Sequence, residues 1–415
     1  GEGPVGIARG QGLSMDKRAL KTEKRRDVLV IGGGPSGLRL AGRLASSGLD
    51  VLVLEKKAAI GGNIVCTGLV GKEVFETYGL ATDSVIQDIQ EARLVSPFGT
   101  PVTYRHARPF ACVVDRDRFD SGLAASAVGA GAEIRLDSRA EDIAVEPDGV
   151  QVTVLTNGRG AVRHPAAMAV IASGVDFALQ KRAGLSSPRT FLHGAQAEIA
   201  SGGGDTTTIF VGRDIAPGAF AWSVPAGDKA RVGLLTRKDP RAHLRSLLLA
   251  KFPAAGDPAE VAIRTKAVAQ GLLARTSGDR ILAVGEAAGQ IKTTTGGGIS
   301  YGLLCADLAA EAVTACFEKS SFDAAALAGY EARWRRAIRR EILVGYHARR
   351  MCSRLSDGQV ESLFHLAQTD GIIPIIRETA DFDWHSGLIM ALLQRLSFMK
   401  LFRTVKETIG GENLS

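Results

Sequence analysis

The stretch that decides the fold is Asp27-Val-Leu-Val-Ile-Gly-Gly-Gly-Pro-Ser-Gly37. Residues 27–31 form a short, mostly apolar run, which is typical of a buried parallel strand. A glycine-rich turn over 32–37 follows, and residues 38–47 then carry apolar side chains at helical spacing up to Gly48. A second apolar run over 51–54 completes a predicted strand–helix–strand unit with a short crossover.

The turn matches the pattern G-x-G-x-x-G at Gly32, Gly34 and Gly37. In such a turn Gly32 permits the tight bend, Gly34 lets the backbone approach a pyrophosphate, and Gly37 packs the helix on the strand. Pro35 and Ser36 lie where the predicted helix begins, and a helix N-terminus attracts phosphate through its dipole and its free N–H groups. The alternative is a glycine-rich turn without a ligand.

An acidic residue closes the second strand of this unit. Glu55 lies near the spacing expected for an acid that binds a ribose hydroxyl, and Lys56 follows it. Because the strand, the turn, the helix and the terminal acid occur together, we predict a dinucleotide cofactor on this unit.

A late segment favours FAD over NAD. Gly278-Asp-Arg-Ile-Leu-Ala-Val-Gly-Glu-Ala-Ala-Gly289 predicts a strand that ends in Gly285-Glu286, followed by a small-residue turn and a helix. We expect Glu286 to reach the ribityl hydroxyls of FAD, a role in which many enzymes of this fold use Asp. The residues expected to face the flavin ring at the helix N-terminus are Gly296, Gly297, Gly298 and Ile299. The alternative is a site where small residues pack a strand against a helix.

Composition narrows the functional classes. The chain has 415 residues, of which 45% are hydrophobic, and a formal net charge of +7. No nucleic-acid-binding module is recognisable, and the basic runs are interpreted as solvated surface. The five cysteines form no C-x-x-C and the histidines form no paired motif, so no zinc or other metal site is expected. This cysteine usage favours a reducing, cytoplasmic compartment, and no run reaches the length of a transmembrane helix.

The predicted fold class is α/β, with a Rossmann-type FAD-binding domain, an inserted antiparallel-sheet substrate domain and a helical C-terminal region. Strands are expected at 133–136, 150–154, 168–171 and 280–284, the second of these with one solvated face, and a helix at 119–129. The predicted parts are a disordered basic extension (1–26), the first part of the FAD-binding domain (27–186), the substrate domain (187–276), a return segment of the FAD-binding domain (277–323) and the helical region (324–415).

From residue 27 onward the chain resembles the geranylgeranyl reductase family of FAD-dependent oxidoreductases, within the hydroxylase-like FAD group. Besides the two motifs, Gly61–Leu69 is similar to a family segment that carries a Cys-x-Gly near the flavin. Val114–Asp120 is similar to the family's arginine-containing turn, and the resemblance places Arg116 beside the cofactor. Cys66 is accordingly a candidate catalytic acid or redox thiol, with simple packing near the flavin as the alternative.

The segment Pro217-Gly-Ala-Phe-Ala-Trp-Ser-Val-Pro225 is similar to the family pattern P-x-x-Y-x-W-x-F-P, which faces a prenyl-binding cavity. Phe220 stands in place of Tyr and lacks its hydroxyl, and Val224 stands in place of Phe and leaves more room. Phe220 and Trp222 are two residues apart, so on a strand they face the same side. The resemblance makes them candidate catalytic-site residues, and an ordinary core pair is the alternative.

The resemblance implies that reduced flavin delivers hydride to a carbon–carbon double bond of a prenyl lipid, while an acid adds the proton. Related hydroxylases often carry an acid at the position of Ser173, which helps with the pyridine nucleotide, so the electron donor is either a ferredoxin-like carrier or NAD(P)H. Apolar residues recur at helical spacing from Leu388 to Phe402 and predict a core helix or a peripheral membrane contact. The competing functions are a flavin monooxygenase, an electron-transfer flavoprotein that reduces a quinone, and a flavin-binding module without turnover.

Overall fold

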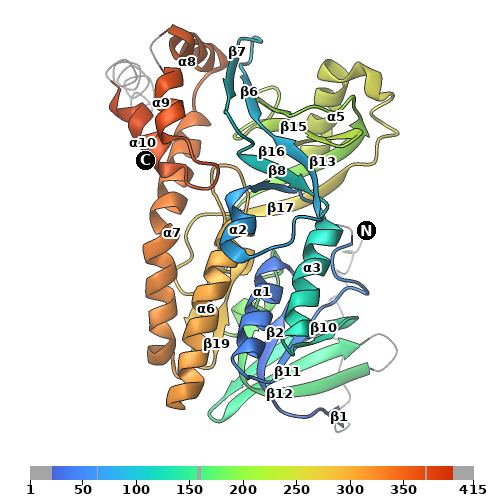
Figure 1. Ribbon diagram of the computed structural model, residues 1–415, viewed down its shortest axis with the longest axis vertical. Coiled ribbons are helices and arrows are strands. Elements are labelled where there is room, and N and C mark those ends of the chain that lie inside the picture. The colour runs from blue at the N-terminus through green and yellow to red at the C-terminus, as the bar shows by residue number, and fades with distance from the viewer. Residues whose placement is uncertain (1–20, 63, 157–159, 370–371, 396–415) are drawn as a thin grey trace, which may run out of the picture.

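The computed structural model describes residues 21–395 of the chain apart from residues 63, 157–159 and 370–371 (Figure 1). Within these residues the strands form three sheets of nine, seven and three strands. The nine-stranded sheet lies in the lower half of Figure 1 and the seven-stranded sheet in the upper half.

The predicted strand–helix–strand unit is confirmed as β2 (Arg26–Ile31), α1 (Pro35–Ser46) and β3 (Val51–Leu54). β2 and β3 are parallel neighbours. Val28 and Val30 pack among the helices on one face of the sheet, whereas Leu29 and Ile31 pack in a second apolar cluster on the other face. Both faces of β2 are therefore buried, as a continuous apolar run predicts.

The nine-stranded sheet gathers strands from distant parts of the chain. Its order in the described residues is β10-β11-β12-β2-β3-β9, with β1 and β19 also pairing β12 and β18 pairing β19. These other strands are β1 (Lys21–Thr22), β9 (Glu133–Arg135), β10 (Ser138–Glu146), β11 (Gly149–Thr156), β12 (Gly160–Ile171), β18 (Ser277–Gly278) and β19 (Ile281–Ala283). The four strands predicted beyond β3 all lie in this sheet. In β11, Val150, Val152 and Val154 are buried and the residues between them are half-buried, as expected for a strand with one solvated side.

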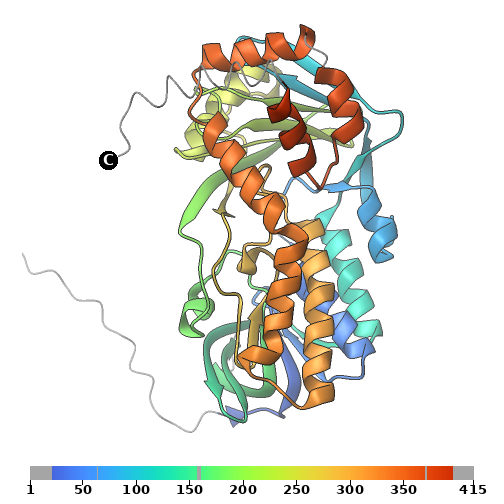
Figure 2. The same ribbon diagram turned by 90° about the vertical axis from the view of Figure 1, so that its left-hand side faces the viewer.

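Helices cover one face of this sheet. They are α1, α3 (Arg116–Gly129), α6 (Ile299–Lys319) and α7 (Ala324–Cys352), and Figure 2 shows α6 and α7 side by side in front of the sheet. By length and apolar composition alone α6 could cross a membrane, contrary to the prediction that no segment is long enough. In the structure it packs between α1 and α7, and more than half of its apolar window is buried.

The seven-stranded sheet has the order β17-β13-β16-β15-β14-β6-β7. Its strands are β6 (Glu91–Val95), β7 (Pro101–Arg105), β13 (Thr190–Ala200), β14 (Thr206–Phe210), β15 (Ala221–Ala226), β16 (Lys229–Thr236) and β17 (Arg264–Gln270). This sheet differs from the predicted antiparallel substrate domain in two ways. β6 and β7 come from the range assigned to the first part of the FAD-binding domain, and β14 pairs with β6 in parallel, so the sheet is not wholly antiparallel. α5 (Pro240–Lys251) covers one face of the sheet with an apolar cluster.

The three-stranded sheet lies between the two large sheets, in the order β4-β8-β5. Its strands are β4 (Leu69–Gly71), β5 (Val85–Ile89) and β8 (Ala111–Val114). The shorter helices are α2 (Glu73–Tyr78), α4 (Ala178–Arg182), η1 (Pro253–Ala255), η2 (Gly285–Ala288), α8 (Asp357–Thr369), α9 (Ile372–Thr379) and α10 (Ser386–Gln394). The C-terminal region is helical as predicted, and the part of the helix expected beyond residue 395 lies outside the described residues.

The predicted disordered extension is wrong for its last six residues. Lys21–Thr22 pairs with β12, and Arg26 begins β2. Arg26 also forms ion pairs with Asp50 and Glu133. The high density of Lys and Arg indicated solvated chain, but acidic partners far along the sequence neutralise part of that charge. Residues 1–20 lie outside the described part of the chain.

Candidate cofactor and substrate site

The three motif glycines of the first turn have different surroundings. Gly32 has φ +115°, and a Cβ atom there would lie 2.4 Å from the carbonyl oxygen of Ala172. A Cβ atom at Gly37 would lie 2.1 Å from the carbonyl oxygen of Gly32. A Cβ atom at Gly34 would meet no other atom of the described chain within 4 Å. The turn is therefore closely packed at Gly32 and Gly37 and open at Gly34, where the sequence predicts the pyrophosphate.

The N-terminus of α1 is suited to an anion. Gly34 is its N-cap, Pro35 occupies the first helical turn, and no side chain caps the helix. No acidic residue lies in its first turn. The N–H groups of a helix start lack intrahelical acceptors, so an anion beside Gly34 would complete their hydrogen bonds.

Glu55 fastens the turn to the loop after β3. It is 8% exposed, and its Oε2 accepts a hydrogen bond of 2.7 Å from the Gly33 N–H. Its Oε1 accepts a hydrogen bond of 3.0 Å from the Lys57 N–H. Lys56, predicted beside the cofactor, forms an exposed ion pair with Asp176 at 3.6 Å. The neighbouring Lys57 instead holds the next turn, donating through Nζ to the carbonyl oxygens of Gly61 and Gly62.

The structure brings the two predicted cofactor motifs together, although about 250 residues separate them. Ser36 lies at their junction. Its Oγ is 2.5 Å from the position that a Cβ atom would take at Gly285, and 2.3 Å from the corresponding position at Gly302 of α6. A side chain at either position would displace the Ser36 hydroxyl, and Gly285 also has φ +70°, so Ser36 is a packing contact between the start of α1 and the late motif.

Glu286 has an ion-pair partner that the local sequence does not predict. Its Oε2 accepts a hydrogen bond of 2.7 Å from Nζ of Lys266, on β17. The ion pair is partly exposed and joins the seven-stranded sheet to the late motif. Glu286 keeps one carboxylate oxygen for another donor, as the predicted ribityl contact requires.

A C-terminal segment, Asp381–His385, docks on the loop that carries Gly296, Gly297 and Gly298. Lys292 Nζ donates to Asp383 Oδ1 at 2.7 Å, and the two side chains are 7% and 14% exposed. Ser300 Oγ donates to the same Asp383 oxygen at 2.7 Å, and Tyr301 donates through its hydroxyl to the Asp383 carbonyl at 2.9 Å. His385 bonds to Thr294. This docking was not predicted, because the segment carries no known motif.

The loop also depends on glycines. A Cβ atom at Gly297 would lie 2.8 Å from Lys292 Cε, and one at Gly298 would lie 2.9 Å from Ile291 Cγ2. Gly296 has φ +78°. Ile299 is the first residue of α6, and Gly298 caps that helix without a side-chain hydrogen bond. The loop thus leads into a helix, as the sequence predicted, and this is a second helix start without a side-chain cap.

Cys66 lies beside Arg116. Arg116 forms a paired hydrogen bond with Asp120, at 3.0 and 2.9 Å. The Cys66 sulfur accepts a hydrogen bond of 3.3 Å from the Gly68 N–H. Burial alone would raise the pKa of the Cys66 thiol, but the Arg116 charge, the Gly68 N–H and the Lys266 charge outweigh burial and lower that pKa. The site therefore favours a thiolate more than an ordinary cysteine environment does.

The Cys66 loop is bound to the seven-stranded sheet. Gln196 donates to the Cys66 carbonyl at 3.2 Å and accepts from the Thr67 hydroxyl at 3.0 Å. Arg231 donates to the Thr67 carbonyl at 2.7 Å. Two neighbouring strands, β13 and β16, therefore fix the position of Cys66.

Phe220 and Trp222 contact each other, with ring centroids 5.8 Å apart. Both pack against an apolar cluster that contains Leu235, Val268 and Ile291. Trp222 lies on Gly233, where a Cβ atom would be 2.5 Å from the indole ring. The indole N–H is buried and has no hydrogen-bond partner among the described residues. The two rings contact each other, as the same-side prediction requires, but Phe220 lies just before β15 and not on the strand with Trp222.

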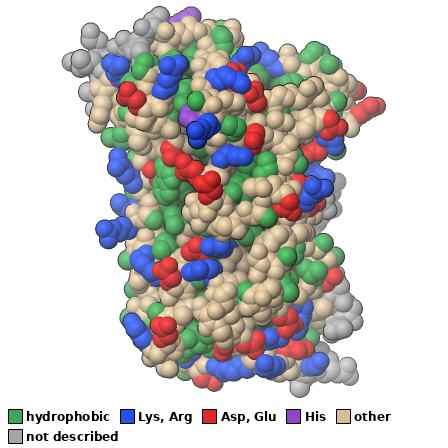
Figure 3. All heavy atoms as spheres, in the orientation of Figure 1, with side chains coloured by type: hydrophobic (Ala, Val, Ile, Leu, Met, Phe, Trp, Pro, Cys, Tyr) green, Lys and Arg blue, Asp and Glu red, His purple; other side chains and the backbone are tan. Residues whose placement is uncertain are grey.

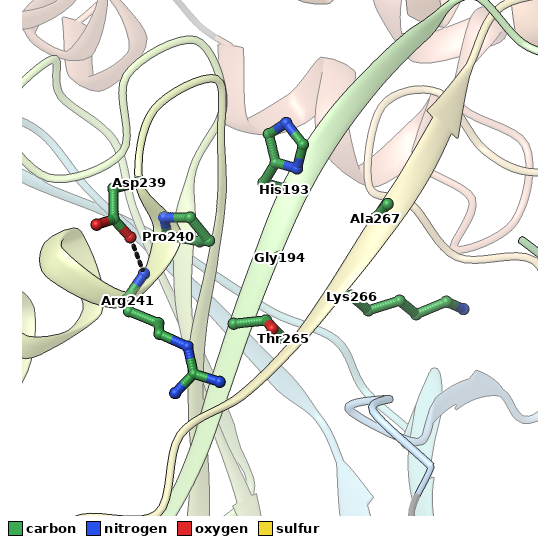
Figure 4. A pocket seen from close by; sticks show the side chains of 8 residues that line it. All are labelled: His193, Gly194, Asp239, Pro240, Arg241, Thr265, Lys266 and Ala267. Carbon is green, nitrogen blue, oxygen red and sulfur yellow. Dashed lines mark hydrogen bonds between the residues drawn. The ribbon is translucent and has the colours of Figure 1, made fainter. Parts of the chain in front are cut away.

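A surface pocket of about 310 Å³ opens beside the start of α5 (Figure 4). His193, Arg241 and Thr265 line it, together with Gly194, Asp239, Pro240, Lys266 and Ala267. Figure 4 shows the Lys266 side chain extending away from Arg241, and its Nζ bonds to Glu286. The pocket therefore does not include the candidate site around Cys66 and Glu286.

Sequence and structure comparisons place the chain among known proteins. The digeranylgeranylglycerophospholipid reductase 1 of Methanopyrus kandleri is 31% identical over 373 residues, which cover 84% of this chain and 98% of that protein. The digeranylgeranylglycerophospholipid reductase 2 of Methanothermobacter thermautotrophicus is 30% identical over 347 residues, which cover 81% of this chain and 90% of that protein. The chain belongs to the geranylgeranyl reductase family of FAD-dependent oxidoreductases.

Two further comparisons concern the fold and the N-terminal part of the chain. The crystal structure of a geranylgeranyl bacteriochlorophyll reductase-like protein from Thermoplasma acidophilum superimposes with a TM-score of 0.80 at 22% identity, covering 93% of this chain and 99% of that one. A sequence model described as lycopene cyclase protein matches residues 27–201. The first likeness shows the shared fold, and the second covers the range with the first cofactor motif.

As a member of the geranylgeranyl reductase family, the protein is an oxidoreductase whose cofactor is FAD. The residues present fit this cofactor. The opening at Gly34, the uncapped start of α1 and the buried Glu55 match the pyrophosphate and ribose of an adenosine half. The contacts of the supporting residues Lys57, Lys266 and Asp383 depend on tertiary structure, so local sequence patterns do not predict them.

Proposed function

We propose that the protein reduces carbon–carbon double bonds of a prenyl lipid. The observation that carries the proposal is the apolar cluster around Phe220 and Trp222. It extends from the seven-stranded sheet to Ile291, beside the loop that carries Gly296, Gly297 and Gly298, which we call the cofactor loop. Gly296 of that loop lies against Leu235 and Val268 of the same cluster. A long apolar substrate suits such surroundings, because each buried CH₂ group contributes about 0.8 kcal/mol. The names of the relatives support a prenyl lipid as the substrate class.

FAD, when bound, supplies the hydride, and the protein supplies binding, orientation and the proton. Glu55 and the N-terminus of α1 would hold the adenosine half of the cofactor, and Glu286 and the start of α6 would hold the flavin half. Phe220 and Trp222 would position the chain of the substrate. An unactivated alkene needs an acid on the carbon opposite the hydride.

Cys66 is our candidate for the acid. Its pKa is lowered, chiefly by Arg116 against the effect of burial, so the thiol releases a proton more readily than an ordinary cysteine does. The resulting thiolate would remain beside the Arg116 charge until solvent returns the proton. The alternative role of Cys66, packing beside the cofactor, predicts no effect of its titration on turnover.

The proposal extends to the electron donor and the location of the protein. Ser173 donates through its hydroxyl to the Asp176 carbonyl, at 2.7 Å, and closes a turn at a position where related hydroxylases carry an acid. We therefore propose a ferredoxin-like donor in place of direct NAD(P)H reduction, in a cytoplasmic protein that contacts membranes peripherally through its C-terminal helical region.

Anaerobic reoxidation tests the function. Chemically reduced enzyme should be reoxidised by a prenyl lipid without O₂, as followed by the visible absorbance of the flavin. The variant Trp222→Phe keeps a ring and loses an indole N–H that has no partner in the described chain, so it should change the reoxidation rate and not the fold. A monooxygenase would stay reduced until O₂ is admitted, and that result would overturn the proposal.

A further inference from the structure

The buried side of α7 ends in an arginine. Buried residues recur along this helix at intervals of three or four and form one stripe. They are Leu327, Tyr330, Trp334, Ile338, Ile342, Gly345 and Arg349. Arg349 is 8% exposed. Arginine is almost never buried to this degree without an acidic partner, so the position requires a physical explanation.

Most of the Arg349 guanidinium has no hydrogen-bond acceptor in the described part of the chain. Nη1 donates to the carbonyl oxygen of Gly218 over 3.4 Å, which is a long hydrogen bond. Nε and Nη2 are buried and have no partner among the described residues. The guanidinium carbon lies 5.7 Å from the centre of the Tyr346 ring. Leaving two charged donors without acceptors destabilises the folded protein, unless a ligand supplies the acceptors.

The neighbouring charges are also positive. Burial is the main cause that lowers the pKa of Arg349, and the charges of Arg237 and Arg350 lower it further. Arg237 packs on the same turn, since a Cβ atom at Gly218 would lie 2.9 Å from Arg237 Cδ. Within the described chain, neither Arg237 nor Arg349 forms an ion pair with a carboxylate. Among the residues that the structure describes, the group therefore lacks a counter-charge.

This cationic group adjoins the proposed substrate site. Gly218 is followed directly by Ala219 and Phe220, and both pack against the apolar cluster that reaches the cofactor loop. A single ligand could therefore place an anionic group at Gly218 and extend an apolar chain along Phe220. A guanidinium offers two parallel N–H donors, a geometry that matches phosphate.

We propose that Arg349, assisted by Arg237, binds a phosphate group, either the headgroup of the prenyl substrate or a free phosphate compound. The inference rests on the proposed function where it concerns the headgroup. The binding of phosphate itself does not depend on that function and is measured separately.

Equilibrium binding to the FAD-loaded protein tests the site. Inorganic phosphate and glycerol 1-phosphate are titrated by calorimetry into the wild type, Arg349→Met, Arg349→Lys and a control, Arg336→Met. Arg336 is exposed on the same helix, where Figure 3 shows basic side chains along the edge that α7 forms in Figure 1. We expect Arg349→Met to weaken binding roughly tenfold or more, Arg349→Lys to weaken it less, and the control to leave it unchanged.

Thermal unfolding in the absence of phosphate distinguishes a phosphate-binding role of Arg349 from a purely structural role. Removing a buried charge that has no counter-charge should leave the unfolding temperature of Arg349→Met unchanged or raise it. A clear fall in that temperature together with unchanged phosphate binding would overturn the proposal, as would the absence of saturable phosphate binding by the wild type.

A kinetic comparison identifies the source of the phosphate. If the ligand is a lipid headgroup, Arg349→Met should raise the KM for geranylgeranyl phosphate and leave that for geranylgeraniol unchanged. If only the binding of inorganic phosphate and glycerol 1-phosphate weakens, the ligand is a free phosphate compound. If neither prenyl substrate is reduced but phosphate binding depends on Arg349, the phosphate site stands and the proposed function fails.

Discussion

At the scale of single residues, Gly34 and Gly37 lie three positions apart in one turn and meet different surroundings. Gly37 touches the backbone of Gly32, whereas Gly34 faces open space. A methyl group at Gly37 must therefore displace the protein's own backbone. A methyl group at Gly34 would meet only a bound ligand. Gly37 is therefore needed for the fold, whereas Gly34 is needed for binding.

We predict that Gly34→Ala mainly weakens FAD binding, whereas Gly37→Ala mainly lowers the stability of the fold. Gly34→Ala should change the stability of the FAD-free protein by less than about 1 kcal/mol, because its φ of −86° suits any residue and the lower entropy of the unfolded alanine chain offsets much of the cost of an alanine N-cap. It should nevertheless weaken FAD binding strongly. Gly37→Ala should destabilise the FAD-free protein by roughly 1–3 kcal/mol through overpacking. Denaturant unfolding and fluorescence titration with FAD measure the two quantities, and equal effects of both variants on both quantities would contradict the assignment.

Cys66 and Cys352 provide an internal comparison of thiols. The charge of Arg116 outweighs burial and lowers the pKa of the half-buried Cys66, whereas desolvation by the surrounding protein raises the pKa of Cys352, although that side chain is exposed. We predict that Cys66 forms its thiolate at lower pH and is alkylated by iodoacetamide at lower pH than Cys352. Peptide mass spectrometry over a pH series measures both in the same molecule.

The double variant Arg116→Gln/Asp120→Asn tests the cause of this difference. It removes the cation without leaving the Asp120 carboxylate unpaired. The pH at which Cys66 is alkylated should rise, and that of Cys352 should not change. If Cys66 responds no differently from Cys352, Arg116 does not control the thiol.

At the scale of elements, the segment 381–385 holds the cofactor loop through the buried pair Lys292–Asp383. We predict that Asp383→Asn weakens FAD binding about tenfold or more, because it leaves the Lys292 charge buried without a counter-charge. The double variant Lys292→Gln/Asp383→Asn should recover much of the affinity. FAD titration and the absorption spectrum of bound flavin report the effect on the loop.

An exposed pair of the same residue types serves as the control. Lys72 and Asp88 are 2.9 Å apart on the surface, so Asp88→Asn should leave FAD binding unchanged. If Asp383→Asn and Asp88→Asn behave alike, the docked segment does not position the cofactor loop.

His385 makes this docking pH-dependent. Burial, and then the charge of Lys292, lower the pKa of His385 below the ordinary value near 6.5, while Glu341 and Asp383 oppose this shift. The undocked histidine binds protons more readily, so stability from docking is complete above about pH 6.5 and declines as the pH falls below it. Amide exchange of residues 292–301 should accelerate at low pH in the wild type and depend less on pH in His385→Gln. Exchange that is constant over this range in the wild type would contradict the prediction.

The elements themselves were largely predictable, because their apolar periodicity is local. The unit from Asp27 to Leu54 and the strands at 150–154 and 168–171 follow from apolar residues spaced for strand or helix. Sheet membership is not local, which explains why β6 and β7 were assigned to the wrong part of the fold. Arg349 did carry a local signal, since it continues the spacing of the apolar residues on α7 and yet is charged.

At the scale of the whole molecule, α7 connects the two large sheets (Figure 2). Tyr330 donates through its hydroxyl to the Ala283 carbonyl of β19 at 2.8 Å, and Trp334 donates to the Thr276 hydroxyl at 3.0 Å. Further along the helix, Arg349 reaches Gly218 beside the seven-stranded sheet. One helix therefore supports both the cofactor side and the proposed substrate side.

The choice of the electron donor that reduces the flavin is also a property of the whole protein. We predict that NADPH and NADH reduce the bound flavin slowly without a partner protein, because Ser173 replaces an acid that helps related hydroxylases with the nucleotide. Anaerobic stopped-flow absorbance measures the rate with each nucleotide. Rapid bleaching at micromolar nucleotide would show that this inference is wrong.

The central claim is that the electrons of reduced FAD end in a carbon–carbon bond of a prenyl lipid. Mass spectrometry of the lipid after a single anaerobic turnover of chemically reduced enzyme tests it most directly. Our account predicts a product heavier by two hydrogens for each double bond reduced, in proportion to the flavin oxidised. An unchanged lipid, with an oxygen atom incorporated only after O₂ is admitted, would contradict it.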